Sequence, residues 1–172
     1  MDTPVITFIG PTGAGKTTLM ETVVATLTRR GVRVGTVKHH SHAGFDIDHP
    51  GKDSWRHARA GSEHVVIAAP DKIASYRLLE RELSLDEILS QMDGLEIILV
   101  EGYRMAGKPT IEFMTSGNGS QPRVPRGQLL AVVSETALDL GVPQFHRGDG
   151  ISVADFLAQR FLKAAPPHRA AK

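Results

Sequence analysis

The sequence Gly10-Pro11-Thr12-Gly13-Ala14-Gly15-Lys16-Thr17-Thr18 decides the fold, because it matches the pattern G-x-x-x-x-G-K-[ST] at every position. It follows an apolar run, Val5 to Ile9, that is typical of a buried strand. Apolar residues spaced four apart follow it, as on one face of a helix. Strand, glycine loop and helix in this order are the context in which the pattern forms a phosphate-binding P-loop. The stretch therefore predicts a nucleoside triphosphate site.

The chemistry of a P-loop gives each part of this stretch a role. Glycines let successive backbone N–H groups turn inward toward phosphate oxygens, and the N-terminus of the following helix adds partial positive charge. A lysine at position 16 reaches the β- and γ-phosphates, and a hydroxyl at position 17 can ligate Mg²⁺. We expect the nucleotide-binding residues to include Gly10, Thr12, Gly13, Ala14, Gly15, Lys16, Thr17 and Thr18.

The composition indicates an ordinary globular chain. Its 172 residues are 41% hydrophobic and carry a formal net charge of +1, which gives no global argument for nucleic acid or a membrane surface as partner. The absence of cysteine excludes disulfides and thiolate metal sites. No apolar stretch reaches the ~20 residues that a membrane span requires, and we expect no leader before the first strand. We expect a cytoplasmic protein.

Predicted helices and strands alternate along the rest of the chain. We expect helices over about 15–30, 50–61, 84–92 and 152–163, and strands over 5–9, 32–37, 64–69, 73–79, 95–100, 110–114, 129–133 and 142–145. This order predicts an α/β fold, a three-layer P-loop NTPase fold with a mainly parallel central β-sheet flanked by helices. We expect one nucleotide-binding domain over 1–163 and a disordered tail over 164–172.

An acidic residue follows the most strand-like segment of the chain. Glu101 comes directly after the apolar run 95–100, and the neighbouring Gly102 allows close backbone approach. Ligands of parallel sheets bind at the carboxyl ends of the strands. In P-loop proteins an acid at this place commonly holds Mg²⁺ or orients the attacking water. We predict that Glu101 is catalytic and, with Thr17, binds the metal.

A polar segment from Lys38 to His57 contains five of the eight histidines and the only tryptophan. Three interpretations stay open: a Zn²⁺ or Ni²⁺ site of histidine and aspartate, an anion-binding surface, or a solvated loop without a ligand. The basic residues Lys38, Lys52 and Arg56 are our candidates for phosphate contacts. Asp46, two residues before Asp48, is a candidate catalytic and metal-binding residue of a switch-type segment.

The usual guanine-reading signal of GTPases is absent, because the sequence contains neither N-K-x-D nor T-K-x-D. Glu135, just after the predicted strand 129–133, lies where a base-reading loop is expected, and its carboxylate can accept hydrogen bonds from a guanine edge. A surface carboxylate without a ligand is the other interpretation of this residue.

A more specific pattern is Phe45-Asp46-Ile47-Asp48-His49-Pro50-Gly51-Lys52-Asp53-Ser54. Further blocks are Gly35-Thr36-Val37-Lys38-His39, Val100-Glu101-Gly102-Tyr103 and Lys108-Pro109-Thr110-Ile111-Glu112. With the P-loop, these blocks resemble the molybdopterin-guanine dinucleotide biosynthesis adaptor proteins (MobB-type), small P-loop GTP-binding proteins of bacteria. The resemblance covers positions 5 to about 135.

The resemblance implies a GTP-binding adaptor, with at most slow GTP hydrolysis, that assists the conversion of molybdopterin to molybdopterin guanine dinucleotide. It implies GTP and Mg²⁺ as cofactors, a homodimer, and a molybdenum cofactor guanylyltransferase as partner. The Asp46–Arg56 block would face molybdopterin or the partner. Two alternatives remain: a metal-delivery NTPase that carries Ni²⁺ or Zn²⁺ on its histidine-rich segment, and a small-molecule kinase.

Overall fold

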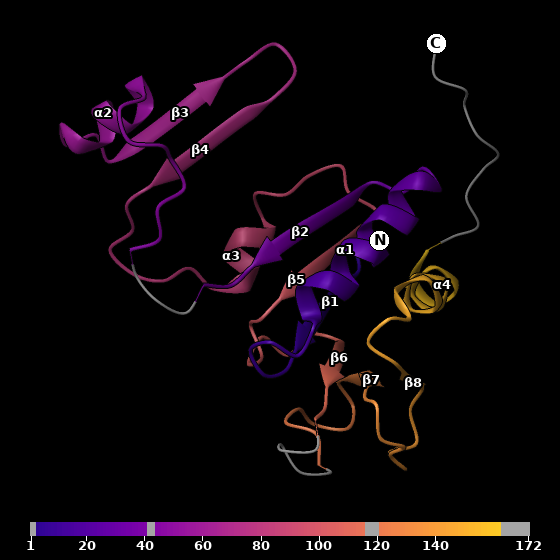
Figure 1. Cartoon of the computed structure of the whole chain (residues 1–172). Coiled ribbons are helices and arrows are strands. Elements are labelled where there is room, and N and C mark those ends of the chain that lie inside the picture. The colour runs from indigo at the N-terminus through magenta and orange to yellow at the C-terminus, as the bar shows by residue number, and fades with distance from the viewer. Residues whose placement is uncertain (1–2, 41–43, 116–120, 163–172) are drawn as a thin grey trace. The chain divides into compact units, whose positions relative to one another are not determined.

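The computed structural model describes residues 3–40, 44–115 and 121–162, which form two compact units (Figure 1). Unit 1 comprises Met1–His39 and Leu85–Lys172, and unit 2 comprises His40–Ser84. The single domain expected over 1–163 stays a prediction, and the expected tail over 164–172 lies outside the described residues. None of the helices in the described ranges is long and apolar enough to cross a membrane.

Unit 1 is built on a six-stranded sheet in the order β2-β5-β1-β6-β7-β8. Every neighbouring pair is parallel, which confirms the mainly parallel sheet expected from the sequence. The strands are β1 (Val5–Ile9), β2 (Val34–Lys38), β5 (Ile97–Glu101), β6 (Thr110–Phe113), β7 (Leu129–Val133) and β8 (Gln144–Phe145). Because parallel strands share a direction, the loops that follow them open on one edge of the sheet.

Two helices cover one face of this sheet. α1 (Lys16–Arg29) and α4 (Gly150–Phe161) pack side by side (Figure 1). Alternate strand residues point toward them, so that Ile6 and Phe8 of β1 are fully buried with Leu27 of α1. This burial is part of the main core of unit 1. The same cluster includes Leu19 of the first turn of α1, which holds the start of the helix against the sheet.

The opposite face is covered by α3 (Leu85–Leu89) and by connecting segments. Leu85 packs on Ile98 and Val100 of β5, and the partly buried Leu138 packs in a second cluster with Ile9 and Val132. With α1 and α4 on the other side, the three layers of the predicted fold are present.

The last helix begins earlier than the sequence predicts. A polar N-cap at Ser152 is the expected start, but α4 begins at Gly150. A Cβ on Gly150 would lie 2.5 Å from Cβ of Thr22, so only glycine lets α4 start this close to α1. The start is therefore set by helix packing, which a capping pattern cannot show.

Unit 2 consists of α2 (Asp53–Arg59) and an antiparallel hairpin of β3 (His64–Ala68) and β4 (Ile73–Arg77). This confirms the hairpin expected across the turn at Pro70-Asp71. Among the described residues of unit 2, Val65 alone is buried. Several large apolar side chains are exposed, namely Phe45, Ile47, Val66, Ile67, Ile73, Leu78 and Leu79.

Candidate functional site: a nucleotide pocket

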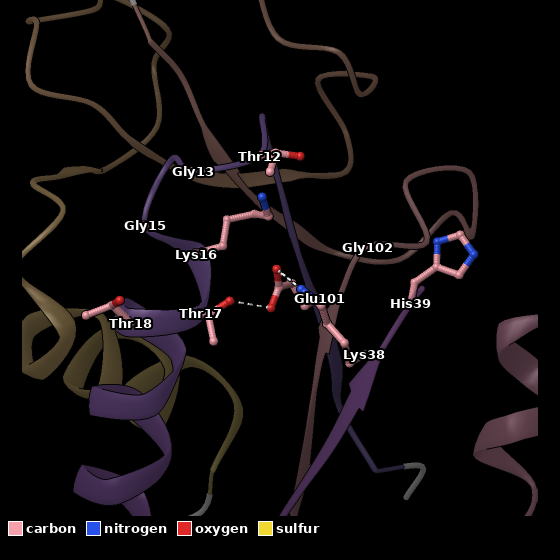
Figure 2. A pocket seen from close by; sticks show the side chains of 10 residues that line it. All are labelled: Thr12, Gly13, Gly15, Lys16, Thr17, Thr18, Lys38, His39, Glu101 and Gly102. Atoms are coloured by element: carbon pink, nitrogen blue, oxygen red, sulfur yellow. Dashed lines mark hydrogen bonds and ion pairs between the residues drawn. The ribbon is translucent and has the colours of Figure 1, made fainter. Parts of the chain in front are cut away.

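A cavity of about 460 Å³ opens at the carboxyl edge of the sheet in unit 1 (Figure 2). It is lined by the loop after β1, the first turn of α1 and the ends of β2 and β5. The lining residues are Thr12, Gly13, Gly15, Lys16, Thr17, Thr18, Lys38, His39, Glu101 and Gly102. Apart from His39 and Gly102, all of these are site residues that the sequence predicts. The fold therefore brings the P-loop, Lys38 and Glu101 to one place.

The glycines of the P-loop have backbone conformations that other residues rarely adopt. Gly10, Gly13 and Gly15 have φ values of 146°, 74° and 91°. A Cβ on Gly10 would also lie 2.6 Å from Cβ of Phe113, so β6 leaves no room for a side chain there. Ala14 is buried, and its N–H donates to the carbonyl of Pro11 at 3.3 Å. Gly10 and Ala14 thus shape the loop, whereas their predicted contact with a nucleotide stays a prediction.

Lys16 folds back over this loop. Its Nζ donates to the carbonyl oxygens of Gly10 at 3.0 Å and of Pro11 at 2.7 Å. Burial lowers the pKa of Lys16 below its ordinary value, Glu101 acts in the opposite direction, and Lys38 lowers it further. The ammonium group is therefore partly desolvated inside the cavity, where an anionic ligand would stabilise its charge.

Glu101 is buried at the end of β5 and is contacted on both carboxylate oxygens. The Thr17 hydroxyl donates to Oε2 at 3.0 Å, and the Lys38 ammonium forms an ion pair with Oε1 (Figure 2). Lys38 and Glu101 are register partners in the parallel pair of β2 and β5. Carboxylate and hydroxyl oxygens are ligands that Mg²⁺ accepts, and this carboxylate already attracts a cation. The donor set of Thr17 and Glu101 therefore fits the predicted metal.

His39 and Gly102 join the cavity wall through packing. The N–H of His39 donates to the carbonyl of Glu101 at 2.8 Å. Gly102 has a φ of 102°, and a Cβ there would lie 2.6 Å from Cβ of His39. The next residue, Tyr103, has a φ of 51° and places its ring 4.5 Å from the His39 ring. The sequence indicates that another part of the chain approaches Gly102 closely. It does not indicate that this part is His39, because β2 and β5 are far apart along the chain.

The remaining predicted site residues, Asp46, Lys52 and Arg56, belong to unit 2. All three are exposed, and Arg56 forms a surface ion pair with Asp53, at 3.6 Å. Asp48 is held more firmly, because it accepts a hydrogen bond from the Tyr76 hydroxyl at 3.0 Å. The cavity is lined by unit 1, so the roles of these three residues stay predictions.

A metal site in the histidine-rich segment finds no support in the described ranges. Within them, no three histidine, aspartate or glutamate side chains are grouped so as to hold a metal ion. His42 lies outside the described residues. Within the part of the chain that the structure describes, no such cluster supports the metal-delivery alternative.

Comparison with known proteins shows the family. The chain matches the family MobB, described as molybdopterin guanine dinucleotide synthesis protein B, over residues 5–135. It is 34% identical to the molybdopterin-guanine dinucleotide biosynthesis adapter protein of Escherichia coli (strain K12), over 93% of this chain and 94% of the relative. A crystal structure of molybdopterin-guanine biosynthesis protein B superposes with a TM-score of 0.73 at 28% identity, covering 92% of this chain and 99% of that chain. Bacillus subtilis MobB shares the fold, with a TM-score of 0.72 at 22% identity over 91% and 97% of the chains. The chain belongs to the MobB family.

Proposed function

We propose that this protein is an adaptor in molybdopterin guanine dinucleotide synthesis and that it binds GTP with Mg²⁺ in the unit 1 cavity. The adaptor role is supported by relatives that carry this description. The observation that carries the nucleotide role is the meeting of Lys16, Thr17 and Glu101 in one cavity. We also expect the protein in the cytoplasm, because its ligand is drawn from the nucleotide pool.

Different cavity residues would contact the phosphates and the Mg²⁺ of a bound triphosphate. Backbone N–H groups at the start of α1 and the Lys16 ammonium attract phosphate oxygens. Thr17 and Glu101 would hold Mg²⁺, which neutralises phosphate charge. Lys38 adds a second cation to the same wall and fixes the orientation of the Glu101 carboxylate.

The same contacts favour slow hydrolysis. A general base must direct a lone pair of its carboxylate toward the attacking water. Both oxygens of Glu101 are engaged, one by Thr17 and the other by Lys38. Glu101 already pairs with the Lys38 cation, and its other contact is to Thr17, the second proposed Mg²⁺ ligand. We therefore propose that Glu101 holds the metal and that the protein is at most a slow GTPase that serves as an adaptor.

The adaptor role can be tested by reconstitution with a molybdenum cofactor guanylyltransferase, the partner we propose. The yield of molybdopterin guanine dinucleotide is measured without adaptor, with the wild-type chain, and with Lys16→Ala. We expect the wild type to raise the yield and Lys16→Ala to leave it at the level without adaptor. Equal stimulation by both proteins would contradict a nucleotide-dependent adaptor.

We propose that unit 2 joins two copies of the chain, because its two-stranded hairpin presents apolar side chains to solvent. Ile73 is 72% exposed and Val66 is 51% exposed. Exposed apolar clusters next to strand edges are typical of protein interfaces. Sedimentation should show a dimer for the wild type and a monomer for Ile73→Glu. A monomeric wild type would overturn this part of the proposal.

The Asp46–Arg56 block is our candidate for molybdopterin or partner contacts, since it carries exposed acidic and basic groups. Asn replacement of Asp46 and Asp48 together should weaken Mg²⁺-dependent binding or lower the yield of the reconstituted reaction. If neither Mg²⁺-dependent binding nor the yield changed, the proposal that this block contacts molybdopterin or the partner would be contradicted.

A further inference from the structure

A second polar cluster lies in unit 1 at the ends of β7 and β8. Glu135 follows β7 by two residues, and His146 and Arg147 follow β8 directly. Both strands run parallel to the others in the sheet, so these residues share the carboxyl edge with the P-loop. In the strand order they lie on the side of β1 opposite to β5, which carries Glu101.

Arg147 reaches the P-loop. Its Cδ lies 3.9 Å from the position that a Cβ on Gly15 would occupy. Its backbone N–H donates to Oε1 of Glu135 at 3.1 Å, and its Nε lies 3.9 Å from the same oxygen. Nδ1 of His146 lies 3.4 Å from the other oxygen, Oε2. The hydrogen bond from the Arg147 backbone is the main cause that lowers the pKa of Glu135, so this carboxyl is ionised at neutral pH.

The backbone around both residues is held by neighbouring side chains. The amide nitrogen of Gln144 donates to the carbonyls of Ser134 at 3.2 Å and Thr136 at 2.9 Å, one on each side of Glu135. On the other loop, a carboxylate oxygen of Asp149 accepts from the N–H of His146 at 2.9 Å. The loops are therefore ordered before any ligand arrives.

The side chains on these ordered loops stay accessible. Glu135 is 56% exposed and Arg147 is 45% exposed. An exposed ion pair contributes little to stability, so folding alone does not account for this arrangement. A charged pair on pinned loops beside a phosphate-binding loop is the arrangement expected of ligand-contacting residues.

We infer that Glu135 and Arg147 form the base-reading end of the nucleotide site and select guanine. The inference rests on the proposed triphosphate site and extends it. With the metal end of the nucleotide at Thr17 and Glu101, the nucleoside leaves the P-loop on the side of Arg147. Guanine presents N1–H and its exocyclic amine as two neighbouring donors, which a carboxylate accepts together. Adenine presents an acceptor nitrogen at N1 and is repelled.

Arg147 serves this selection in two ways. Its contacts orient the Glu135 carboxylate, and its planar guanidinium can cover a face of the purine ring. Guanine selection by these residues would also account for a GTP-binding chain that has no N-K-x-D sequence.

The test compares wild type, Glu135→Gln and Arg147→Ala by calorimetric titration with GTP, ATP, XTP and inorganic tripolyphosphate. XTP carries a carbonyl where GTP has its amine, so the amide of a glutamine can donate to it. We expect Glu135→Gln to lose about 10- to 100-fold in GTP affinity and to gain in XTP affinity. Arg147→Ala should lose about 5- to 10-fold in GTP affinity. Tripolyphosphate, which has no base, should bind all three proteins equally.

The controls are Glu21→Gln on α1 and Arg126→Ala before β7, two exposed residues away from the pair. Neither should change any affinity. An unchanged ratio of GTP to ATP affinity in Glu135→Gln, with tripolyphosphate still bound, overturns base reading and leaves the phosphate site intact. Equal losses of GTP and tripolyphosphate in Arg147→Ala make Arg147 a phosphate contact and overturn its assignment here. A wild type that binds no tripolyphosphate overturns the proposed triphosphate site and this inference with it.

Discussion

The two units of the chain differ in how far their apolar side chains are buried. Unit 1 buries them on both faces of a six-stranded sheet, whereas among the described residues of unit 2 only Val65 is buried. The charged groups differ in the same direction. Glu101 is buried and held on two sides, while Asp46, Lys52 and Arg56 are exposed. Unit 1 therefore provides a preorganised pocket, and unit 2 provides surface that is suited to contacts with other molecules.

The largest expected difference between the two units is in how much a truncated apolar side chain lowers the free energy of unfolding. Phe8 is fully buried beneath α1, so Phe8→Ala should lower the free energy of unfolding by about 3–5 kcal/mol. Ile73→Ala in unit 2 removes an exposed side chain and, at a protein concentration low enough to keep the chain monomeric, should change this free energy by less than about 0.5 kcal/mol. Urea denaturation measures both values. Similar losses for the two variants would show that unit 2 contributes to the core as unit 1 does.

The next effect concerns the phosphate site. Lys16→Ala removes the ammonium that lies over the P-loop and should lower GTP affinity about 100-fold, or about 3 kcal/mol. Lys72→Ala removes an exposed lysine from the β3–β4 turn of unit 2 and should leave GTP affinity unchanged. Calorimetry with GTP distinguishes the two. Retained affinity in Lys16→Ala would refute the P-loop assignment.

A smaller effect is expected at the metal end of the pocket. Glu101→Gln keeps the size of the side chain but removes its charge, so the gain in GTP affinity on adding Mg²⁺ should fall about tenfold. Glu96→Gln, just before the start of the same strand, is the matched control and should keep the full gain. Titrations with and without Mg²⁺ measure the gain. A Mg²⁺ effect that survives in Glu101→Gln would assign the metal to other ligands.

The smallest effect is the pH dependence of binding. Burial lowers the pKa of Lys16 in the free protein, and only its protonated form attracts phosphate strongly. GTP affinity should therefore begin to fall, as pH rises, at a pH below the range in which ordinary lysines titrate. Lys16→Arg stays charged at these pH values, so its affinity should lack this decline. The same decline in both proteins would assign it to another group.

Local sequence patterns predicted the parts of the molecule that depend on local physics. The P-loop, the parallel order of strands and helices, and the strand that ends at Glu101 all follow from spacing and residue type. The hairpin of unit 2 follows from two β-rich runs around Pro70-Asp71. Each of these signals lies within a few residues of the chain.

Features that depend on distant contacts were not visible in the sequence. Gly150 starts α4 because Thr22 lies against it, and no capping pattern records that contact. No sequence pattern marked Arg147 as a site residue, because it approaches Gly15 only when β8 joins the sheet. His39 likewise enters the pocket through its packing on Gly102.

The most direct test of the account is a competition titration of a fluorescent guanine nucleotide with GTP, GDP, ATP and ADP, with and without Mg²⁺. The account predicts that GTP competes about tenfold or more better than ATP and that Mg²⁺ strengthens its binding. Equal or better competition by ATP would contradict the central claim that this pocket is a GTP site.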